Sequence, residues 1–529
     1  MTMTAATSLR PMLMSAETEY SVTGFRSKRE VSKELLHAEL AAAVRKHQRC
    51  LPDASGRVAI FLENGSRFYL DAGDHPELAQ PEVLSPREVA LYDKAGERIL
   101  ARAAQSLIDA NPGIELSVVK NNVAGFAPDD ASWAQHSSFM CWTSLEQAAE
   151  QILSHLVTQL PFAGAGCLSD SSHGFGFELS QRARHFVKAI GPETTHDRPI
   201  FCNRIRKQLD ASHAGWVRAH MINKDSQRMA FGTYVCFASN GLIFHHMNQR
   251  QRFDKRLALA DPVRAIRAVS LDPWLKTRLK LADGREMTPL QIQFEYLEQC
   301  ERFNNGGNGP DWGQEAARHW RETLETLEQN PMRLASRLDP YMKLALFNHE
   351  LNRAHYTWSH LRLALKQLFT LRKTFPSVVL KSIIERDDQA IPQELQPAFQ
   401  KFLQHHRRLD RDLLQFAGRM QVLEHQYHTL GGLYDRLEEA GHAEPVILTE
   451  TEVQRAMTEP PQGSRAAVRS RCIREHHDSG HHVCDWTFVL NTADNTSIDL
   501  QNPFETELKV VQGEQKSNDR HSLLRRILG

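Results

Sequence analysis

Apolar and polar residues alternate along the first part of the chain in patterns typical of both strands and helices. Residues 58–63 and 66–71 are predicted to be strands around Asn64-Gly65, a pair that tolerates the positive φ angles of a tight hairpin turn. Residues 31–47 place apolar side chains at helical spacing on one face. Further strand-like runs occur at 116–120, 174–180 and 229–244. Strands and helices that mix without a regular βαβ repeat predict an α+β fold with a largely antiparallel sheet.

A helical pattern dominates the chain between about residues 312 and 437. Pro376 and the Ile391-Pro392 pair interrupt it, because proline lacks the backbone N–H that a helix interior uses. The segment therefore predicts a hairpin of antiparallel helices, inserted at about residues 356–420.

Strand signals return towards the C-terminus, at residues 446–448 and 486–490. They predict a small C-terminal domain over residues 439–529. Residues 1–438, including the helical insertion, are then expected to form the main domain, and 529 residues are ample for this division.

The overall charge argues against some partner classes. The chain has 64 Lys and Arg residues against 64 Asp and Glu residues, so its formal net charge is zero. Without a basic excess we expect neither nucleic acid nor a membrane as partner. Mean hydropathy is −0.47, and no apolar run reaches the length of a membrane span.

The N-terminal segment and the cysteines favour a cytoplasmic protein. Residues 1–16 lack the basic region and apolar stretch of a secretion signal. Eight cysteines are scattered along the chain without a Cys-x-x-Cys pair, which fits neither a disulfide framework nor a zinc ribbon. We expect reduced thiols in the cytoplasm.

Carboxylates occur at short spacing on predicted strands in the N-terminal half. Glu17 and Glu19 point to the same face of an extended segment, as do Tyr69 and Asp71, and Glu77 follows in the next turn. Like charges on one buried face repel unless a cation lies between them. Oxygen ligands favour Mg²⁺ or Mn²⁺ over zinc. The alternative is a solvated strand face without a metal.

Ordered motifs along most of the chain are similar to those of one protein family. In chain order they are Glu17-Thr-Glu-Tyr20, Asn64-Gly-Ser-Arg67, Tyr69-Leu-Asp71, His75-Pro-Glu77, Asp93-Lys-Ala-Gly-Glu97, Lys120-Asn-Asn122, Ser180-Gln-Arg-Ala183, Arg218-Ala-His220, His425-Gln-Tyr-His428 and Thr458-Glu-Pro-Pro-Gln462. Together they resemble the Pup ligase and depupylase family, whose members are relatives of glutamine synthetase. Motifs that keep one order from residue 17 to about residue 486 are far more specific than any single one.

The resemblance implies an α+β, glutamine-synthetase-like fold, with a curved antiparallel β-sheet backed by helices. It also implies ATP and Mg²⁺ as cofactors. In this family, ATP phosphorylates the γ-carboxylate of a C-terminal glutamate on a small, disordered protein modifier, and a substrate lysine attacks the acyl phosphate. The expected partners are such a modifier, ending in Glu or Gln, and lysine-bearing proteins. Phosphate leaves far more readily than hydroxide, and divalent cations neutralise the triphosphate.

Site residues carry over from the resemblance by position. Five positions match metal-coordinating residues of the family: Glu17, Tyr69, Glu77, His136 and His220. Asp71 matches the catalytic aspartate, and we expect it to accept a proton from the lysine ammonium, whose pKa of about 10.4 leaves little free amine. Arg218 and Arg465 fall where the family places positive charge near the nucleotide. For the two histidines, the alternative is a core histidine satisfied by a backbone carbonyl.

The chain departs from the family pattern at several positions. His136-Ser137-Ser138 stands where the family commonly has His-Glu-Asn, and Arg204-Ile-Arg-Lys207 replaces an acidic segment. Because charge selects partners, these departures suit a different modifier or acceptor; they also fit a weakened enzyme. A non-catalytic adaptor that binds the modifier is therefore one alternative function.

The direction of the reaction is a second open point. Family members that remove the modifier typically carry an extra loop between the first glutamates and the Asn-Gly hairpin. Here Glu17 and Asp71 are only 54 positions apart, which is similar to the ligases. We expect a ligase; the alternative is a deamidase or isopeptidase acting on the same modifier.

Two segments have no role in this scheme. The helical segment at about residues 356–420 is longer than its family counterpart, and partner recognition and added core packing explain it equally well. A histidine-rich segment, residues 476–484, offers imidazole and thiol ligands for zinc, but its irregular spacing favours a polar loop.

Overall fold

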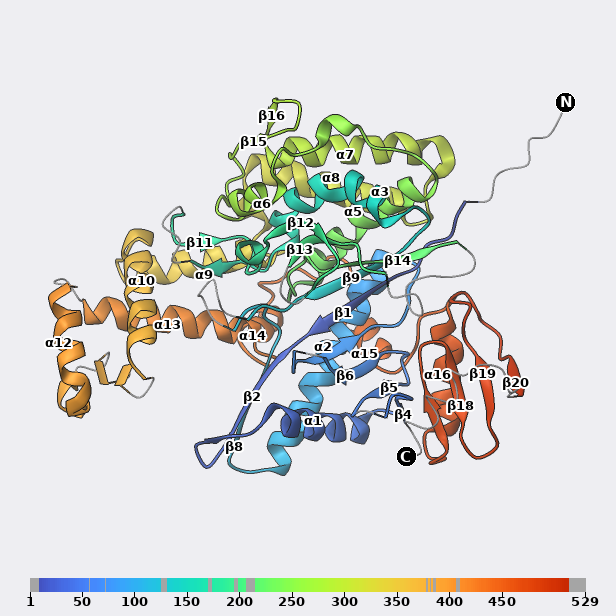
Figure 1. Ribbon diagram of the computed structural model, residues 1–529, viewed down its shortest axis with the longest axis horizontal. Coiled ribbons are helices and arrows are strands. Elements are labelled where there is room, and N and C mark those ends of the chain that lie inside the picture. The colour runs from blue at the N-terminus through green and yellow to red at the C-terminus, as the bar shows by residue number, and fades with distance from the viewer. Residues whose placement is uncertain are drawn as a thin grey trace.

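A seven-stranded sheet forms the centre of the molecule (Figure 1). The computed structural model describes residues 9–56, 58–71, 73–124, 131–169, 174–194, 198–205, 215–376, 379–380, 382–383, 387–405 and 410–512. From edge to edge the strands are β14 (Val217–Met221), β9 (Gln135–Cys141), β1 (Met14–Glu19), β7 (Pro76–Ala79), β6 (Arg67–Leu70), β5 (Ile60–Leu62) and β4 (Cys50–Pro52). Every neighbouring pair is antiparallel, which confirms the predicted α+β fold with an antiparallel sheet.

The predicted hairpin is confirmed by β5 and β6, which pair on either side of Asn64-Gly65. Gly65 has a φ of +88°, a left-handed conformation that glycine adopts without strain. A Cβ atom at Gly65 would approach the Cβ atoms of Pro81 and Ala466 to 3.2 Å. The turn therefore lies directly against a helix from the C-terminal part of the chain.

Three helices pack side by side on one face of the sheet: α1 (Lys33–His47), α2 (Pro86–Ala110) and α5 (Ala230–Asn248). The helix expected at residues 31–47 is confirmed as α1. The strand expected at residues 229–244 is wrong, because this segment forms α5. Almost every side chain of α5 is buried, so the run is apolar all round and carries neither the alternation of a strand nor the stripe of a surface helix.

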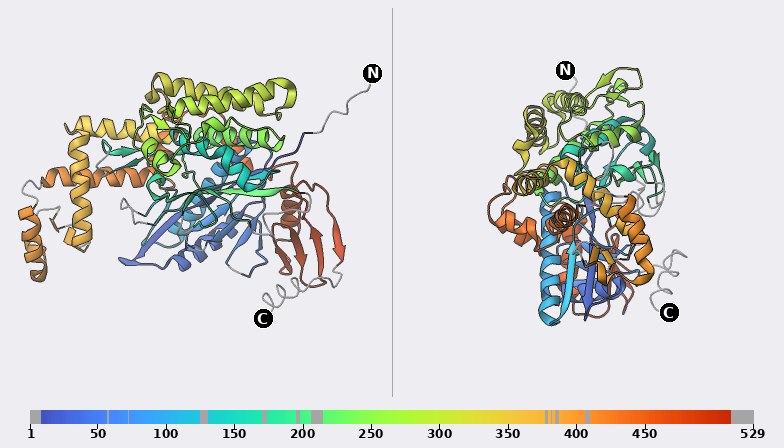
Figure 2. Two further views of the ribbon diagram at one scale, coloured as in Figure 1. Left: turned by 45° about the horizontal axis from the view of Figure 1, so that its top comes forward. Right: turned by 90° about the vertical axis from the view of Figure 1, so that its left-hand side faces the viewer.

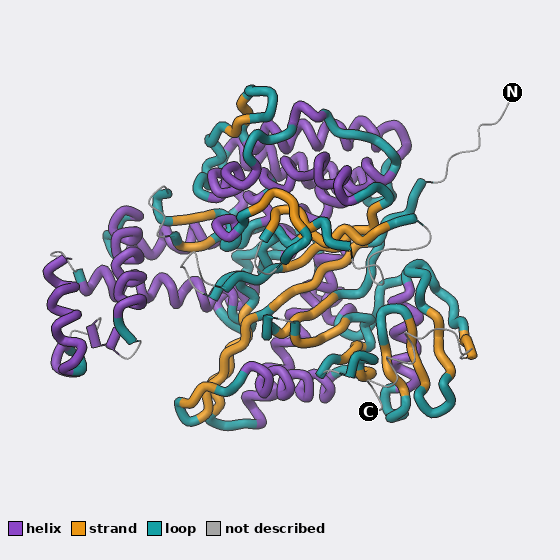
Figure 3. Tube along the Cα trace, in the orientation of Figure 1, coloured by secondary structure: helices purple, strands orange, loops and turns teal. Residues whose placement is uncertain are grey.

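Further helices form a second layer over α5 and a connection to the arm (Figure 3). They are α3 (Leu145–Thr158), α4 (Leu160–Ala163), α6 (Pro262–Ser270), α7 (Pro289–Phe303), α8 (Gly313–Gln329) and α9 (Asp339–Arg353). Two-stranded sheets lie near these helices: β10 (Cys167–Leu168) with β11 (Phe177–Glu178), β12 (Lys188–Gly191) with β13 (Pro199–Cys202), and β15 (Leu279–Lys280) with β16 (Glu286–Met287). A three-stranded sheet of β2 (Ser21–Arg26), β3 (Arg29–Glu30) and β8 (Ile114–Val119) packs instead on α1 and α2. Among the described helices, none has both the length and the apolar character needed to cross a membrane.

The predicted helical insertion forms an arm that projects from the body (Figure 2). Its helices are α10 (Trp358–Thr374), α12 (Gln396–His405) and α13 (Arg411–His428). α10 packs against α13 and crosses it, and α12 lies at the outer end of the arm. The segment is helical as expected, but the antiparallel hairpin is wrong, because its two long described helices cross instead of running side by side. The C-terminal end of α13 returns to the body.

The C-terminal part of the chain begins with α14 (Leu433–Glu439) and α15 (Glu450–Ala456), of which α15 packs on α2. It then forms α16 (Arg465–His476) and a four-stranded antiparallel sheet: β17 (His482–Cys484), β18 (Phe488–Asn491), β19 (Thr496–Asp499) and β20 (Val510–Gln512). Residues 446–448 are not a strand, so that expectation is wrong, whereas the one at 486–490 is confirmed by β18. The apolar cluster of this sheet includes Leu51 and Phe61 from the central sheet. The domain boundary at residue 439 stays a prediction.

Candidate active site

Neighbouring strands carry the candidate ligands on one face of the sheet. β1 lies between β7 and β9, with Glu19 opposite Glu77 and Glu17 opposite His136. Alternate residues of a strand point to opposite faces, so these side chains share the face turned away from α2. His220 continues the row on the edge strand β14. Residues from four separate segments therefore converge through strand register alone.

Glu17, His136 and His220 form a first cluster. Each offers a ligand atom, and these atoms lie within 4.8 Å of one another. The Nδ1 atom of His136 is 3.7 Å from Oε2 of Glu17, and Nη1 of Arg218 donates to Oε1 of Glu17 at 2.8 Å. Burial pushes the pKa of Glu17 upwards, but Arg218 and the two histidines outweigh it and hold this pKa well below its usual value. The carboxylate is therefore charged at neutral pH.

Glu19, Asp71 and Glu77 form a second cluster, with ligand atoms again within 4.8 Å of one another. Burial, with repulsion from Asp71, raises the pKa of Glu19 to about 7 although His136 opposes the shift. Burial and the charges of Glu17 and Glu19 raise the pKa of Glu77 well above its usual value. A cation among these carboxylates would favour the ionised forms of Glu19 and Glu77.

His136 connects the two clusters. Its Nε2 atom lies 3.5 Å from Oε2 of Glu19, and its Nδ1 atom lies 3.7 Å from Oε1 of Glu77. The same ring thus faces carboxylates of both groups. The two clusters therefore form one continuous site rather than two separate ones.

Tyr69 lies near the end of β6, and Asp71 follows directly after the strand. Oδ1 of Asp71 accepts hydrogen bonds from the backbone N–H groups of Gly73 and His75, at 2.9 and 2.7 Å. These two bonds fix the carboxylate beside Glu19 and Glu77. Tyr69 lies opposite Glu77 in the strand register, and burial together with the nearby carboxylates raises the pKa of its phenol well above the usual value. The structure thus brings Tyr69 and Asp71 to the predicted ligands.

The two arginines predicted near the nucleotide have different surroundings. Arg218 lies on β14 within the site, where it also donates to Oγ of Ser138 at 3.2 Å. Arg465 lies at the start of α16 and binds Glu82 and the carbonyl of Leu500, at 2.7 and 2.9 Å. The structure therefore brings Arg218 to the ligand clusters and joins Arg465 to the segment after β7. The nucleotide role of both stays a prediction.

Glu19 belongs to the second cluster, but it was not among the metal ligands carried over from the family resemblance. The signal was present, because Glu17-x-Glu19 places both carboxylates on one strand face. The sequence did not indicate which strand pairs with β1. Glu19 lies opposite Glu77 only because β1 pairs with β7, which is far away in the chain.

The donor set fits a hard divalent cation. Carboxylate oxygens dominate, imidazole nitrogens add to them, and no thiol is present, which suits Mg²⁺ or Mn²⁺. Glu77 supports this assignment, since its buried Oε1 has no hydrogen-bond partner. Among the described residues, the groups that bring three such ligands together are these two clusters. The histidine-rich segment is not one of them; there His476 and His482 stack with ring centroids 4.0 Å apart.

The residues that depart from the family pattern lie at different places relative to the site. Ser138 lies within it, with Oγ 3.4 Å from Nδ1 of His220. The Oγ atom of Ser137 is buried without a hydrogen-bond partner. Arg206 and Lys207 lie outside the described residues.

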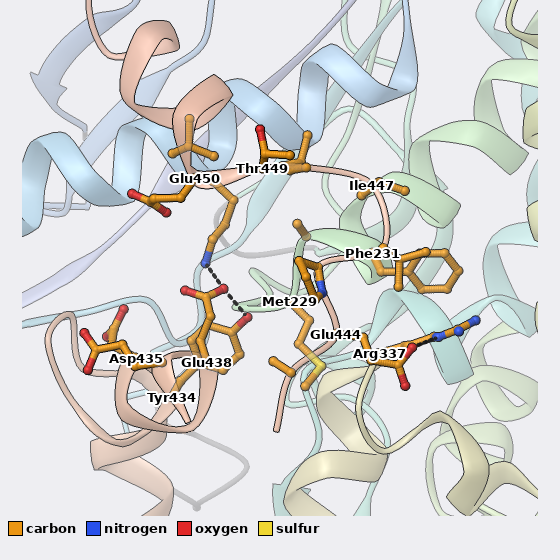
Figure 4. Close-up of a pocket in the computed structure, with 18 of the residues that line it drawn as sticks. Met229, Phe231, Arg337, Tyr434, Asp435, Glu438, Glu444, Ile447, Thr449 and Glu450 are labelled. Carbon is orange, nitrogen blue, oxygen red and sulfur yellow. Dashed lines mark hydrogen bonds and ion pairs between the residues drawn. The ribbon is translucent and has the colours of Figure 1, made fainter. Parts of the chain in front are cut away.

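A separate cavity of about 590 Å³ lies among α2, α14 and α15 (Figure 4). Met229, Phe231 and Ile447 form part of its apolar wall. Its charged residues pair with one another, as in the contact between Lys94 and Glu438 at 3.5 Å. None of the predicted site residues lines it. The cavity is therefore not the candidate active site.

The fold and the site together define an enzyme with an α+β fold and a carboxylate-rich candidate metal site on one face of its sheet. A family profile described as "Pup-ligase protein" matches residues 12–369 and 375–490. The chain belongs to the Pup-ligase family.

Individual relatives include both activities of that family. A Pup–protein ligase from Acidimicrobium ferrooxidans is 30% identical over 461 residues, covering 85% of this chain and 87% of that protein. A depupylase from Acidothermus cellulolyticus is also 30% identical, over 428 residues, covering 79% of this chain and 72% of that protein. Among solved structures, the complex of Pup with its ligase PafA matches with a TM-score of 0.71 at 20% identity, covering 98% of this chain and 92% of that one. PafA with ADP matches with a TM-score of 0.65, also at 20% identity, covering 90% and 91%.

Proposed function

We propose that this protein is an ATP-dependent ligase that joins a small, Pup-like protein modifier to lysine side chains of other proteins. The γ-carboxylate of the modifier's C-terminal glutamate would be activated as an acyl phosphate, and the lysine amine would displace phosphate to leave an isopeptide bond. The observation that carries the proposal is the convergence of two ligand clusters on one sheet face, the second of which includes Asp71.

The metal site supports this chemistry. Glu17, His136 and His220 would hold one Mg²⁺ ion, and Glu19, Tyr69 and Glu77 would hold another. Bound Mg²⁺ neutralises phosphate oxygens and the charge that develops during phosphoryl transfer. The side chains themselves preorganise the site, because strand pairing fixes their spacing before any ligand arrives.

Asp71 is the proposed proton acceptor. A lysine ammonium must lose a proton before its nitrogen can attack, and a positioned carboxylate can accept that proton. The backbone N–H groups of Gly73 and His75 bind only Oδ1 of Asp71, so they orient the carboxylate without occupying Oδ2.

The ligase direction is favoured over removal of the modifier. The chain covers 87% and 89% of two Pup–protein ligases, but only 72% and 73% of the depupylases. The short spacing between Glu17 and Asp71 agrees with this difference. An adaptor without catalysis would have no physical need to keep three mutually repelling carboxylates together.

The location is proposed to be the cytoplasm. All eight cysteines are free thiols and are buried. This arrangement suits a reducing compartment.

The test is a reconstituted reaction. Purified protein is mixed with ATP, Mg²⁺, a lysine-bearing acceptor and a disordered modifier that ends in Glu or in Gln. We expect a conjugate with one isopeptide bond and stoichiometric ADP, with the Glu-ended modifier only. Release of modifier from preformed conjugates without any new conjugate would instead identify a depupylase, and no turnover with bound modifier would identify an adaptor.

A further inference from the structure

A buried polar network lies directly behind the candidate active site, between the sheet and α2. At its centre, Oδ1 of Asp93 accepts hydrogen bonds from the hydroxyl of Thr18 at 3.2 Å and from Nε2 of Gln135 at 2.8 Å. The same Nε2 atom donates to the Thr18 hydroxyl at 2.9 Å. Oδ2 of Asp93 accepts from Nζ of Lys120 at 2.6 Å. Both carboxylate oxygens of Asp93 are thus engaged.

The two strands held by Asp93 are those that supply the central ligands. Thr18 lies between Glu17 and Glu19 on β1, and Gln135 immediately precedes His136 on β9. Because successive side chains alternate between faces, the ligands point into the site while Thr18 and Gln135 point to α2. A shift of either strand would therefore move the ligands with it.

The network continues into the protein through paired charges. Lys120 also donates to Glu97 at 2.8 Å, and Glu97 binds Lys94 at 3.0 Å and Arg228 at 3.3 Å. Despite burial, these cations hold the pKa of Glu97 far below its usual value. Lys224 approaches from the other side and donates to Oε1 of Gln135 at 2.6 Å.

Burying so many charges is costly, and apolar side chains of similar size would pack behind the sheet as well. Strand pairing sets the register of β1 and β9 within the sheet. The hydrogen bonds to Asp93 also fix these strands relative to α2, with a directionality that apolar contacts lack. Residues behind the ligands of a metal site commonly set the geometry and affinity of that site.

We propose that Asp93 is a positioning residue of the metal-binding face, which holds β1 and β9 in place through Thr18 and Gln135. The inference rests on the proposed function only in requiring that the face binds divalent cations.

The test replaces the Thr18 hydroxyl without disturbing the ion pairs. Thr18→Val keeps the shape of the side chain and removes its bonds to Asp93 and Gln135, and Thr18→Ser restores the hydroxyl. Thr158→Val is the matched control: this threonine on α3 is also fully buried, donates to the carbonyl of Ser154 at 2.8 Å and accepts from Gln293 at 2.8 Å. Thermal stability and the Mn²⁺ dissociation constant, the latter by calorimetry, are measured for every variant.

We expect Thr18→Val to weaken Mn²⁺ binding about tenfold, with Thr18→Ser close to wild type. Thr158→Val should lose similar thermal stability but bind Mn²⁺ as wild type does. Equal Mn²⁺ binding by Thr18→Val and wild type would overturn the inference and leave the proposed function untouched. A wild-type protein that binds no Mn²⁺ would instead overturn the proposed metal site, and the inference with it.

Discussion

At the residue scale, the charge states of the buried carboxylates determine how the site can bind a cation. Glu17 is stabilised as an anion by Arg218, whereas Glu19 and Glu77 resist ionisation because they are buried beside other carboxylates. A bound cation would offset the repulsion among these carboxylates. Protons and the metal ion should therefore compete for the second cluster. Asp71 belongs to that cluster and is the proton acceptor of the proposed reaction.

Asp71→Asn should slow conjugation by roughly a thousandfold, since positioned acid–base groups contribute about 10²–10⁴ to rate. ADP binding should be nearly unchanged, because the variant keeps the shape of the side chain. Asp74→Asn is the control, since Asp74 is exposed in the same turn with a φ of +59° that asparagine tolerates. Conjugation at the wild-type rate by Asp71→Asn would refute its role as proton acceptor.

Mg²⁺ affinity should rise with pH through the pKa of Glu19, which is raised to about 7. At pH 6 this carboxyl holds a proton that the metal must displace, whereas at pH 8 the proton is already lost. Titration with Mg²⁺, followed by the increase in Tm, should give affinity about tenfold weaker at pH 6 than at pH 8. The Glu19→Gln variant should bind Mg²⁺ more weakly than wild type, and its Mg²⁺ affinity should no longer change with pH through the pKa of Glu19. A pH-independent affinity in the wild type would contradict the assignment of Glu19.

At the scale of elements, local patterns predicted the segments whose neighbours are close in sequence. The β5–β6 hairpin was predictable because Asn64-Gly65 specifies its turn, and α1 because its apolar residues form one stripe. α5 was not, since it is buried on all sides. The site depends on pairs such as Glu17 with His136, and no local rule joins residues so far apart in the chain. The family resemblance supplied that information for most ligands, but not for Glu19.

The stability of α2 should depend on its N-terminal cap. This stability matters for the site because α2 carries Asp93 and Glu97 behind it. The Ser85 hydroxyl accepts from the backbone N–H of Glu88, and the Glu88 carboxylate accepts from the backbone N–H of Ser85. Ser85→Ala should lower the free energy of unfolding by about 1 kcal/mol, as measured with urea, and Ser85→Thr should restore it. Unchanged stability of Ser85→Ala would show that tertiary packing alone fixes this end of α2.

At the scale of the whole molecule, the C-terminal part is joined to the central sheet through charges as well as apolar contacts. Arg469 on α16 is fully buried, donates to Glu82 at 2.7 Å and to the carbonyl of Gly65 at 3.1 Å, and lies 4.7 Å from the ring centre of Trp486. Glu82 is only partly buried, and Arg469 and Arg465 lower its pKa to about 2. This contact holds the turn of the β5–β6 hairpin against α16.

Arg469→Ala should lower the free energy of unfolding by about 3 kcal/mol, because it removes a fully buried side chain and leaves the partly buried Glu82 with Arg465 alone. Arg353→Ala is the control: it breaks an ion pair with Glu350 whose arginine is largely exposed, and should have little effect. Denaturation with urea measures both. An Arg469→Ala protein as stable as the control would show that the C-terminal part is held by apolar packing alone.

The most direct test is a crystal structure of the protein with Mn²⁺ and a non-hydrolysable ATP analogue, with anomalous scattering recorded at the manganese edge. We predict manganese peaks at roughly 2.0–2.3 Å from ligand atoms of Glu17, His136 and His220, and from those of Glu19 and Glu77, with Asp71 alongside. Manganese bound elsewhere, or an ordered nucleotide with no metal on this face, would contradict the account.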